Sequence, residues 1–229
     1  MRTPFKSLAI AVGAALVSSL SAGAAVAVEL PPPDIAIFTS SNGTLVEVPK
    51  STFQESTIRL RGENSSAPSD PGVASRLIDW DQWFGCFSLN NESDVFASYT
   101  FYYNGVGKDV RLKCGAGNGT SGWGYKHIRD GKEARWQEKL DAAKAAGWKP
   151  QEWGVQSWDD LMSGATAGVI LYPDYLSHSA VGNKWCANNE FYLLDRKTNR
   201  ELYSFRVEAA WASDSDRLIT SFPSNRTYC

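Results

Sequence analysis

The chain has 229 residues, with 23 Lys and Arg against 25 Asp and Glu and a formal net charge of −2. This balance argues against a protein that binds nucleic acid through a general excess of positive charge. About 200 residues beyond an N-terminal leader are enough to bury one hydrophobic core, or one core and a small extension.

Residues 1 to 27 have the three parts of a secretory signal peptide. Arg2 and Lys6 form a basic start, an apolar run spans Leu8 to Leu20, and Ala25 to Ala27 read as an A-x-A cleavage site. The run is short and alanine-rich for a membrane helix, although an uncleaved anchor is the alternative. We expect a secreted bacterial protein, cleaved after Ala27 and without stable membrane association. Cleavage removes two basic residues and leaves 21 Lys and Arg against 25 Asp and Glu.

Residues 28 to 75 are predicted to form a small N-terminal β extension and a linker. The linker is the Gly, Pro, Ser and Asp-rich stretch from 62 to 75. The predicted short strands before it are Ile35–Phe38, Leu45–Val48 and Ile58–Leu60. We place a domain boundary at the linker, ahead of a larger domain from 76 to 229.

The larger domain begins with a predicted β-hairpin. The runs VFASYTFYY (95 to 103) and DVRLKC (109 to 114) are rich in β-branched or aromatic residues. Asn104-Gly105-Val106-Gly107 between them has strong turn chemistry. The sequence therefore predicts two neighbouring antiparallel strands.

Two helices are predicted next. Residues 132 to 146 place Trp136, Leu140 and Ala143 on one helical face, and Gly147 follows as a terminator. A second helix is expected from Trp158 to about Gly164. It follows a capping-box-like pair, Ser157 and Asp160.

The last part of the chain returns to strand patterns. The predicted strands are 190 to 195, 201 to 211 and 217 to 222, and they read as an antiparallel meander. Helices first and a sheet afterwards, without alternation between the two, indicate an α+β fold.

Four cysteines form an even set in a chain with a signal peptide, which indicates two disulfides. Cys86–Cys114 and Cys186–Cys229 are the favoured pairs, because each pair brackets a run of neighbouring strands. A zinc site is the competing interpretation. We expect no metal, since there is no C-x-x-C pair and no histidine beside a cysteine.

Positive charge gathers in one part of the chain. Residues 108 to 149 carry 10 basic against 5 acidic side chains. Within them, the stretch GWGYKHIRDGKEARW places His127 between Lys126 and Arg129. Histidine suits general acid or base catalysis because its ordinary pKa lies near neutrality. Candidate phosphate-binding residues on one helix face are Lys132, Arg135 and Lys139, with Trp123 as a further substrate contact. The alternatives are a surface histidine and an ordinary solvated helix face.

Other candidate catalysts lie in the C-terminal half. His178 and, six residues later, Lys184 would complete a two-histidine ribonuclease site, unless His178 belongs to a polar loop. Thr220 and Ser221 lie on the last predicted strand, where alternation points their hydroxyls to opposite faces.

The segment CGAGNGTSGWGYKHI, the helix after it and the strand ending LITSFP together resemble the barnase–EndoU–colicin–RelE superfamily of small RNases, over residues 110 to 223. The resemblance implies that His127, a cation at Lys126 or Arg129, and a hydroxyl at Thr220 or Ser221 line the active cleft. Family members often have a second histidine and a Trp soon after the first motif. Here the Trp is Trp136 but no histidine accompanies it, which leaves His178, Glu133 or Glu208 for the second proton transfer.

Two functions follow as hypotheses. The first is a toxin-like endoribonuclease without metal or cofactor, whose partner is RNA and whose producer uses a separate inhibitor protein or export for protection. The second is a non-catalytic binding or envelope-interaction module, in which Trp80, Trp83 and Trp123 stack on sugars instead of filling the core. A serine hydrolase with Ser179 and His178 is a third interpretation, but it has no G-x-S-x-G context.

Overall fold

The computed structural model describes residues 33–41, 43–53 and 77–229. The signal peptide, the predicted strand 58–60 and the linker lie outside the described residues. No helix in the described part of the chain is long and apolar enough to cross a membrane.

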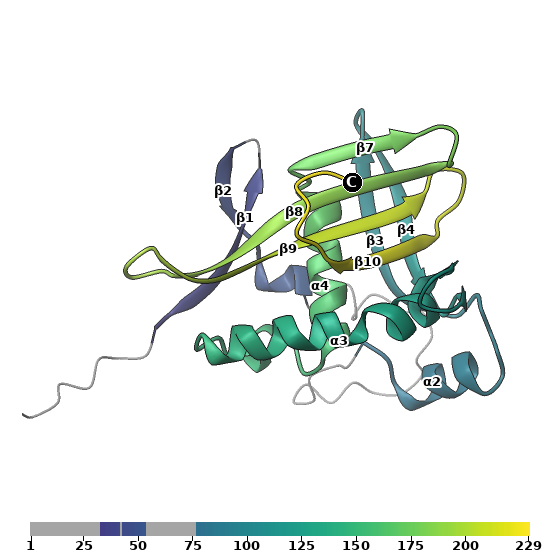
Figure 1. Cartoon of the computed structure of the whole chain (residues 1–229), viewed down its shortest axis with the longest axis horizontal. Helices are drawn as coiled ribbons and strands as arrows, with labels where there is room; N and C mark the ends of the chain where they lie inside the picture. The colour runs from purple at the N-terminus through teal and green to yellow at the C-terminus, as the bar shows by residue number, and fades with distance from the viewer. Residues whose placement is uncertain (1–32, 42, 54–76) are drawn as a thin grey trace, which may run out of the picture. The chain divides into compact units, whose positions relative to one another are not determined.

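The fold is α+β, with two helices followed by an antiparallel meander, as predicted (Figure 1). The helices are α3 (Gly124–Ala145) and α4 (Trp158–Leu171). The three predicted strands of the meander are present as β8 (Lys184–Asp195), β9 (Arg200–Ala212) and β10 (Leu218–Pro223). A fourth strand that was not predicted, β7 (Tyr175–Ser179), pairs with β8. The stretch around His178 is therefore a strand and not a polar loop.

The predicted N-terminal β extension joins this sheet. β1 (Ile35–Ser41) pairs antiparallel with the end of β8, and β2 (Thr44–Glu47) pairs with β1. The strand order is β10-β9-β8-β1-β2, and β7 also pairs with β8. Ala36 and Ile37 are fully buried, so β1 contributes to the core of the same domain.

Both helices cover one face of the sheet. The Trp136 ring of α3 packs edge-on against Phe205 of β9. Gly168 of α4 leaves room for the Phe191 ring of β8, which a Cβ at that position would approach to 2.8 Å. α4 is buried on all sides from Asp160 to Ile170, and it continues to Leu171 beyond its predicted end.

The predicted hairpin is present as β3 (Val95–Tyr103) and β4 (Val106–Lys113). Its turn is the two residues Asn104 and Gly105, both with positive φ, as a tight hairpin turn requires. Tyr99 Oη lies 3.0 Å from Ser163 Oγ, which ties β3 to α4.

Four elements near α3 were not assigned from the sequence. α2 (Trp80–Phe87) begins with a reciprocal capping box between Asp79 and Gln82. β5 (Ala116–Gly117) pairs with β6 (Gly122–Trp123) directly before α3. A short 3-10 helix, η1 (Pro150–Trp153), links α3 to α4.

α3 begins eight residues before the predicted start, so His127 and the nearby cations are helical. Apolar periodicity starts only near Trp136, and Gly124 and Gly131 are poor helix formers. Tertiary contacts override this weak propensity. Gly124 has φ +75°, and a Cβ there would lie 2.6 Å from the Lys113 carbonyl oxygen, so only glycine fits.

Both predicted disulfides are present. Cys86–Cys114 joins α2 to the end of β4, and Cys186–Cys229 joins β8 to the last residue. They close separations of 28 and 43 residues. Chain-entropy estimates for loops of this length give about 3–4 kcal/mol of stabilisation each.

Asp160 joins α4 to the segment that leads into α2. Its Oδ1 accepts a hydrogen bond from the Leu77 backbone N–H at 2.7 Å, and its Oδ2 accepts from the N–H groups of Gln156 and Ser157. Burial raises the pKa of this carboxyl, and the hydrogen bonds from Gln156, Ser157 and Leu77 act in the opposite direction. The side chain therefore replaces backbone partners that a buried turn otherwise lacks.

We expect Asp160→Asn to lower the free energy of unfolding by about 2 kcal/mol, because an amide nitrogen cannot accept these hydrogen bonds. Urea denaturation measures the change. Asp141→Asn, at an exposed position on α3, is the matched control and should change stability by less than about 0.5 kcal/mol. Equal effects of the two substitutions would contradict the assigned role of Asp160.

Candidate functional site

The glycine-rich segment Asn118–Ser121 folds back onto the first turns of α3. His127 Nδ1 lies 2.5 Å from the Asn118 carbonyl oxygen, and the Gly119 N–H donates to Asp130 Oδ2 at 2.6 Å. Lys132 Nζ donates to the Gly119 carbonyl oxygen at 3.2 Å. Three side chains of the basic motif therefore hold the chain's own loop.

Two glycines allow this close approach. A Cβ at Gly119 would lie 2.8 Å from Gly131 Cα, and a Cβ at Gly131 would lie 2.6 Å from the Gly119 carbonyl oxygen. Neither distance is compatible with a side chain, so the Gly119–Gly131 contact lets the loop lie against the helix. The loop then covers the turn of α3 that carries His127.

His127 is buried, with 7% of its surface exposed. A carbonyl oxygen can only accept, so Nδ1 carries the hydrogen. In the neutral ring, Nε2 is then the acceptor, which is the tautomer that a general base at Nε2 requires. Among the described residues, however, the imidazole is buried and its observed partner is the loop carbonyl.

His178 lies elsewhere. It is an exposed residue of β7, where it pairs with Trp185, and the two ring centroids are 4.5 Å apart. β10, against which α3 packs, is three strands away from β7, or about 14 Å at the usual strand spacing. Lys184 starts β8 opposite Ser179. The structure therefore does not assemble the two-histidine set with Lys184.

The hydroxyls of the last strand are also enclosed. Ser221 is fully buried, and its Oγ accepts from Thr166 Oγ1 at 2.7 Å. Its carbonyl oxygen accepts from Trp136 Nε1. Thr220 Oγ1 is buried without a hydrogen-bond partner among the described residues. Ser221 thus links α3, α4 and β10, and neither hydroxyl lies free in a cleft.

The cations predicted beside His127 and those of the predicted row Lys132, Arg135 and Lys139 point in different directions. Lys126 Nζ and Arg129 Cζ lie 5.8 and 4.8 Å from the Phe87 ring of α2. Lys132 Nζ lies 5.9 Å from the Phe222 ring of β10, while Arg135 is exposed. Lys139 forms an ion pair with its neighbour Glu138, and the Arg217 guanidinium lies over the Trp123 ring. The candidate Glu208 forms an ion pair with Arg226 on the face of the sheet opposite the helices.

An open groove of about 620 Å³ runs along α3 beside the end of α2. Its lining residues are Phe87, Lys126, Arg129, Asp130, Gly131, Glu133, Ala134 and Gln137. Arg129 and Glu133 form an i,i+4 ion pair at 3.5 Å. The groove therefore offers an aromatic wall together with hydrogen-bonding groups of both signs.

An aromatic row on α2 leads into this groove. Trp80 and Trp83 are 70% and 36% exposed, and their rings are stacked with centroids 5.4 Å apart. Trp83 in turn lies 5.3 Å from Phe87, the groove wall. Trp80 and Trp83 were predicted from the sequence as sugar-stacking residues, whereas Phe87 was not. The signal was present as the i, i+3, i+7 spacing of the three aromatics, once α2 is taken as a helix.

The charge around the row and groove is not positive. Among the described residues that line the groove or begin α2, the cations are Lys126 and Arg129, and the carboxylates are Asp79, Asp81, Asp130 and Glu133. Two cations against four carboxylates do not attract a polyanion. The site therefore has an excess of negative charge, although the sequence motif that contributes to it is basic.

We expect His127→Ala to lower the free energy of unfolding by about 1–2 kcal/mol, because it leaves the Asn118 carbonyl and the loop without their partner. Hydrogen exchange of the Gly119 amide should accelerate in the same variant. His178→Ala, at an exposed strand position, is the matched control and should leave both quantities nearly unchanged. Identical exchange at Gly119 in all three proteins would contradict the anchoring role.

Comparison with protein-family models, with curated proteins and with solved structures finds no match to this chain. The assignment of function therefore rests on the geometry described above.

Proposed function

We propose that the protein is an exported module that binds carbohydrate through the aromatic row of α2 and the adjoining groove. The observation that carries the proposal is the exposed, stacked pair Trp80 and Trp83, continuous with Phe87. Large aromatic side chains are normally buried or placed at interfaces, so an exposed and ordered row of them indicates a binding surface.

The ligand class follows from what the site offers. Flat ring faces suit the apolar faces of sugar rings, and Arg129, Glu133 and Gln137 can donate to and accept from hydroxyl groups. The carboxylates that outnumber the cations disfavour a nucleic acid or an acidic polymer. A neutral oligosaccharide meets both conditions.

Trp80→Ala and Trp83→Ala should each weaken binding of a neutral oligosaccharide by about tenfold or more, because exposed Trp side chains at binding sites commonly contribute over 1.4 kcal/mol. A glycan array screen identifies the ligand, and titration calorimetry measures the loss. Tyr102→Ala removes a similarly exposed aromatic from the β3–β4 hairpin and is the control. Equal affinity for wild type, both Trp variants and the control would refute the proposed site.

A second candidate is the metal-independent endoribonuclease. The observation that favours it is the hydrogen bond from Nδ1 to the Asn118 carbonyl, which leaves Nε2 as a base on the most basic part of the chain. RNA cleavage at this position requires the loop 118–121 to move away from α3, since His127 is buried. Lys132, which contacts the same loop at the Gly119 carbonyl oxygen, is then a candidate cation for a phosphate.

If the mature protein cuts RNA in EDTA, His127→Ala should reduce the rate by about 10²–10⁴, since general acid–base catalysis contributes that much. His178→Ala should retain the wild-type rate, because His178 lies on β7, three strands away from β10 and α3. A gel assay for products with 2′,3′-cyclic ends makes the measurement on folded protein. Absence of cleavage by wild type, or full cleavage by His127→Ala, would eliminate this candidate.

A further inference from the structure

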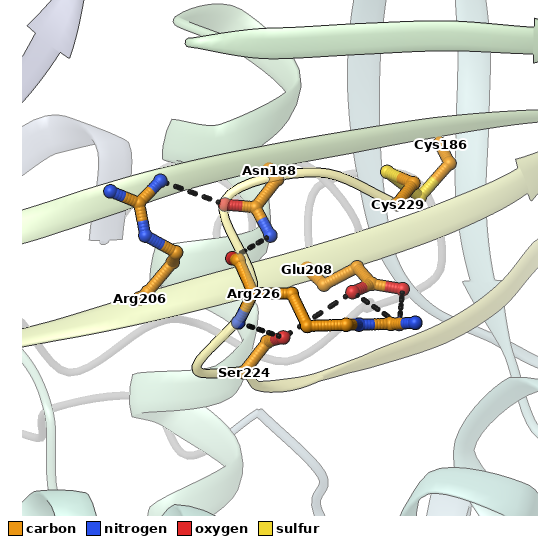
Figure 2. Close-up of a disulfide and its surroundings, with 7 residues drawn as sticks. All are labelled: Cys186, Asn188, Arg206, Glu208, Ser224, Arg226 and Cys229. Atoms are coloured by element: carbon orange, nitrogen blue, oxygen red, sulfur yellow. Dashed lines mark hydrogen bonds and ion pairs between the residues drawn. A yellow bond between two sulfur atoms is a disulfide. The ribbon is translucent and has the colours of Figure 1, made fainter.

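Part of the outer face of the sheet, opposite the helices, is covered by residues 224 to 229. Residues 224 to 229 follow β10 and run back across β9 and β8, as Figure 2 shows, until Cys229 reaches Cys186. The Ser224 N–H donates to the Arg206 carbonyl oxygen at 2.9 Å. We call these six residues the strap.

Two polar side chains of the sheet bind the strap through hydrogen bonds. Asn188 and Glu208 are opposite each other in the β8–β9 register, and both are buried. Asn188 Nδ2 donates to the Arg226 carbonyl oxygen at 2.9 Å, and Arg226 Nη2 donates to both Glu208 oxygens at 2.6 Å. The sheet therefore binds one arginine residue at its backbone and at its side chain (Figure 2).

A neighbouring ion pair orients this site. Arg206 Nη1 donates to Asn188 Oδ1 at 3.0 Å, so the Asn188 amide is turned with Nδ2 toward the strap. Arg206 Nη2 also pairs with Glu190 at 2.7 Å, which leaves Glu208 as the carboxylate that faces Arg226. The amide and carboxylate positions are thus set by the sheet.

The strap itself buries little. Residues 225 to 228 are exposed, and half of the Arg226 side chain is in solvent. Apolar burial therefore does not hold these residues, and the disulfide is their covalent attachment. Cys229 is partly exposed, whereas Cys86 and Cys114 are fully buried. Access favours reduction of Cys186–Cys229 over the other disulfide.

We propose that the strap is a disulfide-locked cover over a guanidinium-binding site formed by Glu208 and Asn188, and that reduction opens this site to other arginine-bearing extended segments. A dithiol reductant donates two electrons to the Cys186–Cys229 bond, which breaks into two thiols as the reductant forms its own disulfide. The freed strap remains attached to β10, so it competes with other segments at a high effective concentration.

Selective reduction is the first arm of the test. The folded mature protein is treated briefly with dithiothreitol and then with iodoacetamide, and peptides are analysed by mass spectrometry. Cys186 and Cys229 should be alkylated at least tenfold faster than Cys86 and Cys114. Equal alkylation rates for the two cysteine pairs would contradict the proposal that Cys186–Cys229 is the disulfide that opens on reduction.

Binding is the second arm. The full chain carrying Cys186→Ser, Cys229→Ser and Arg226→Ala keeps its strap but presents no guanidinium to Glu208. A fluorescent peptide, SNRTYS, should bind this protein at least tenfold more tightly than it binds the oxidised wild type. Equal affinity for both proteins, or no binding to either, would overturn the site.

Two further substitutions on that background separate recognition from folding. Glu208→Gln should weaken peptide binding by tenfold or more, because it removes the charge that faces the guanidinium. Glu201→Gln, at an exposed position near the start of β9, removes a carboxylate that the site does not use and should stay within about twofold. Unchanged peptide affinity in Glu208→Gln, or an equal loss of affinity in both variants, would contradict the role of Glu208 as the guanidinium-binding carboxylate.

Discussion

The pairing of β8 with three other strands is the constraint on which the rest of the structure depends. β9 pairs with β8 along its whole length, β7 pairs with the first part, and β1 pairs with the last part. Side chains of β8 alternate between the two faces, so this register sends Phe191 toward the helices and Asn188 toward the strap. A slip of one residue would exchange the two faces, which explains why a buried apolar face specifies the register so strongly.

The two faces of the sheet are closed by different kinds of interaction. α3 and α4 cover the inner face with large apolar side chains, among them Trp136 against Phe205. The outer face is polar, and six residues of irregular chain cover part of it through hydrogen bonds, ion pairs and one disulfide. The inner face supplies apolar burial and therefore most of the stability, whereas the outer face can open at little cost in apolar area.

The basic, glycine-rich motif shows how a pattern typical of phosphate binding can serve the fold. His127, Asp130 and Lys132 all have the residue types of an active site. Each of them contacts the loop Asn118–Ser121, whose backbone groups take the positions that an external ligand would otherwise occupy. The exposed polar groups of α3 lie on its other side, where Lys126 and Arg129 face the Phe87 ring of α2.

Local patterns in the sequence determined a good part of this protein. The Asn104-Gly105 turn, the capping box of Ser157 and Asp160, the meander and both disulfides were predicted, because turn chemistry, short-range periodicity and cysteine positions need few distant contacts. Tertiary structure decided the rest. The early start of α3 depends on glycine contacts with a preceding loop and strand, and the place of β1 depends on pairing with a strand far along the chain. Three further features arise only when separate segments pack together: the burial of His127, the groove beside Phe87 and the site that binds Arg226. Residue spacing along the chain does not reveal the shape of the space between two packed elements.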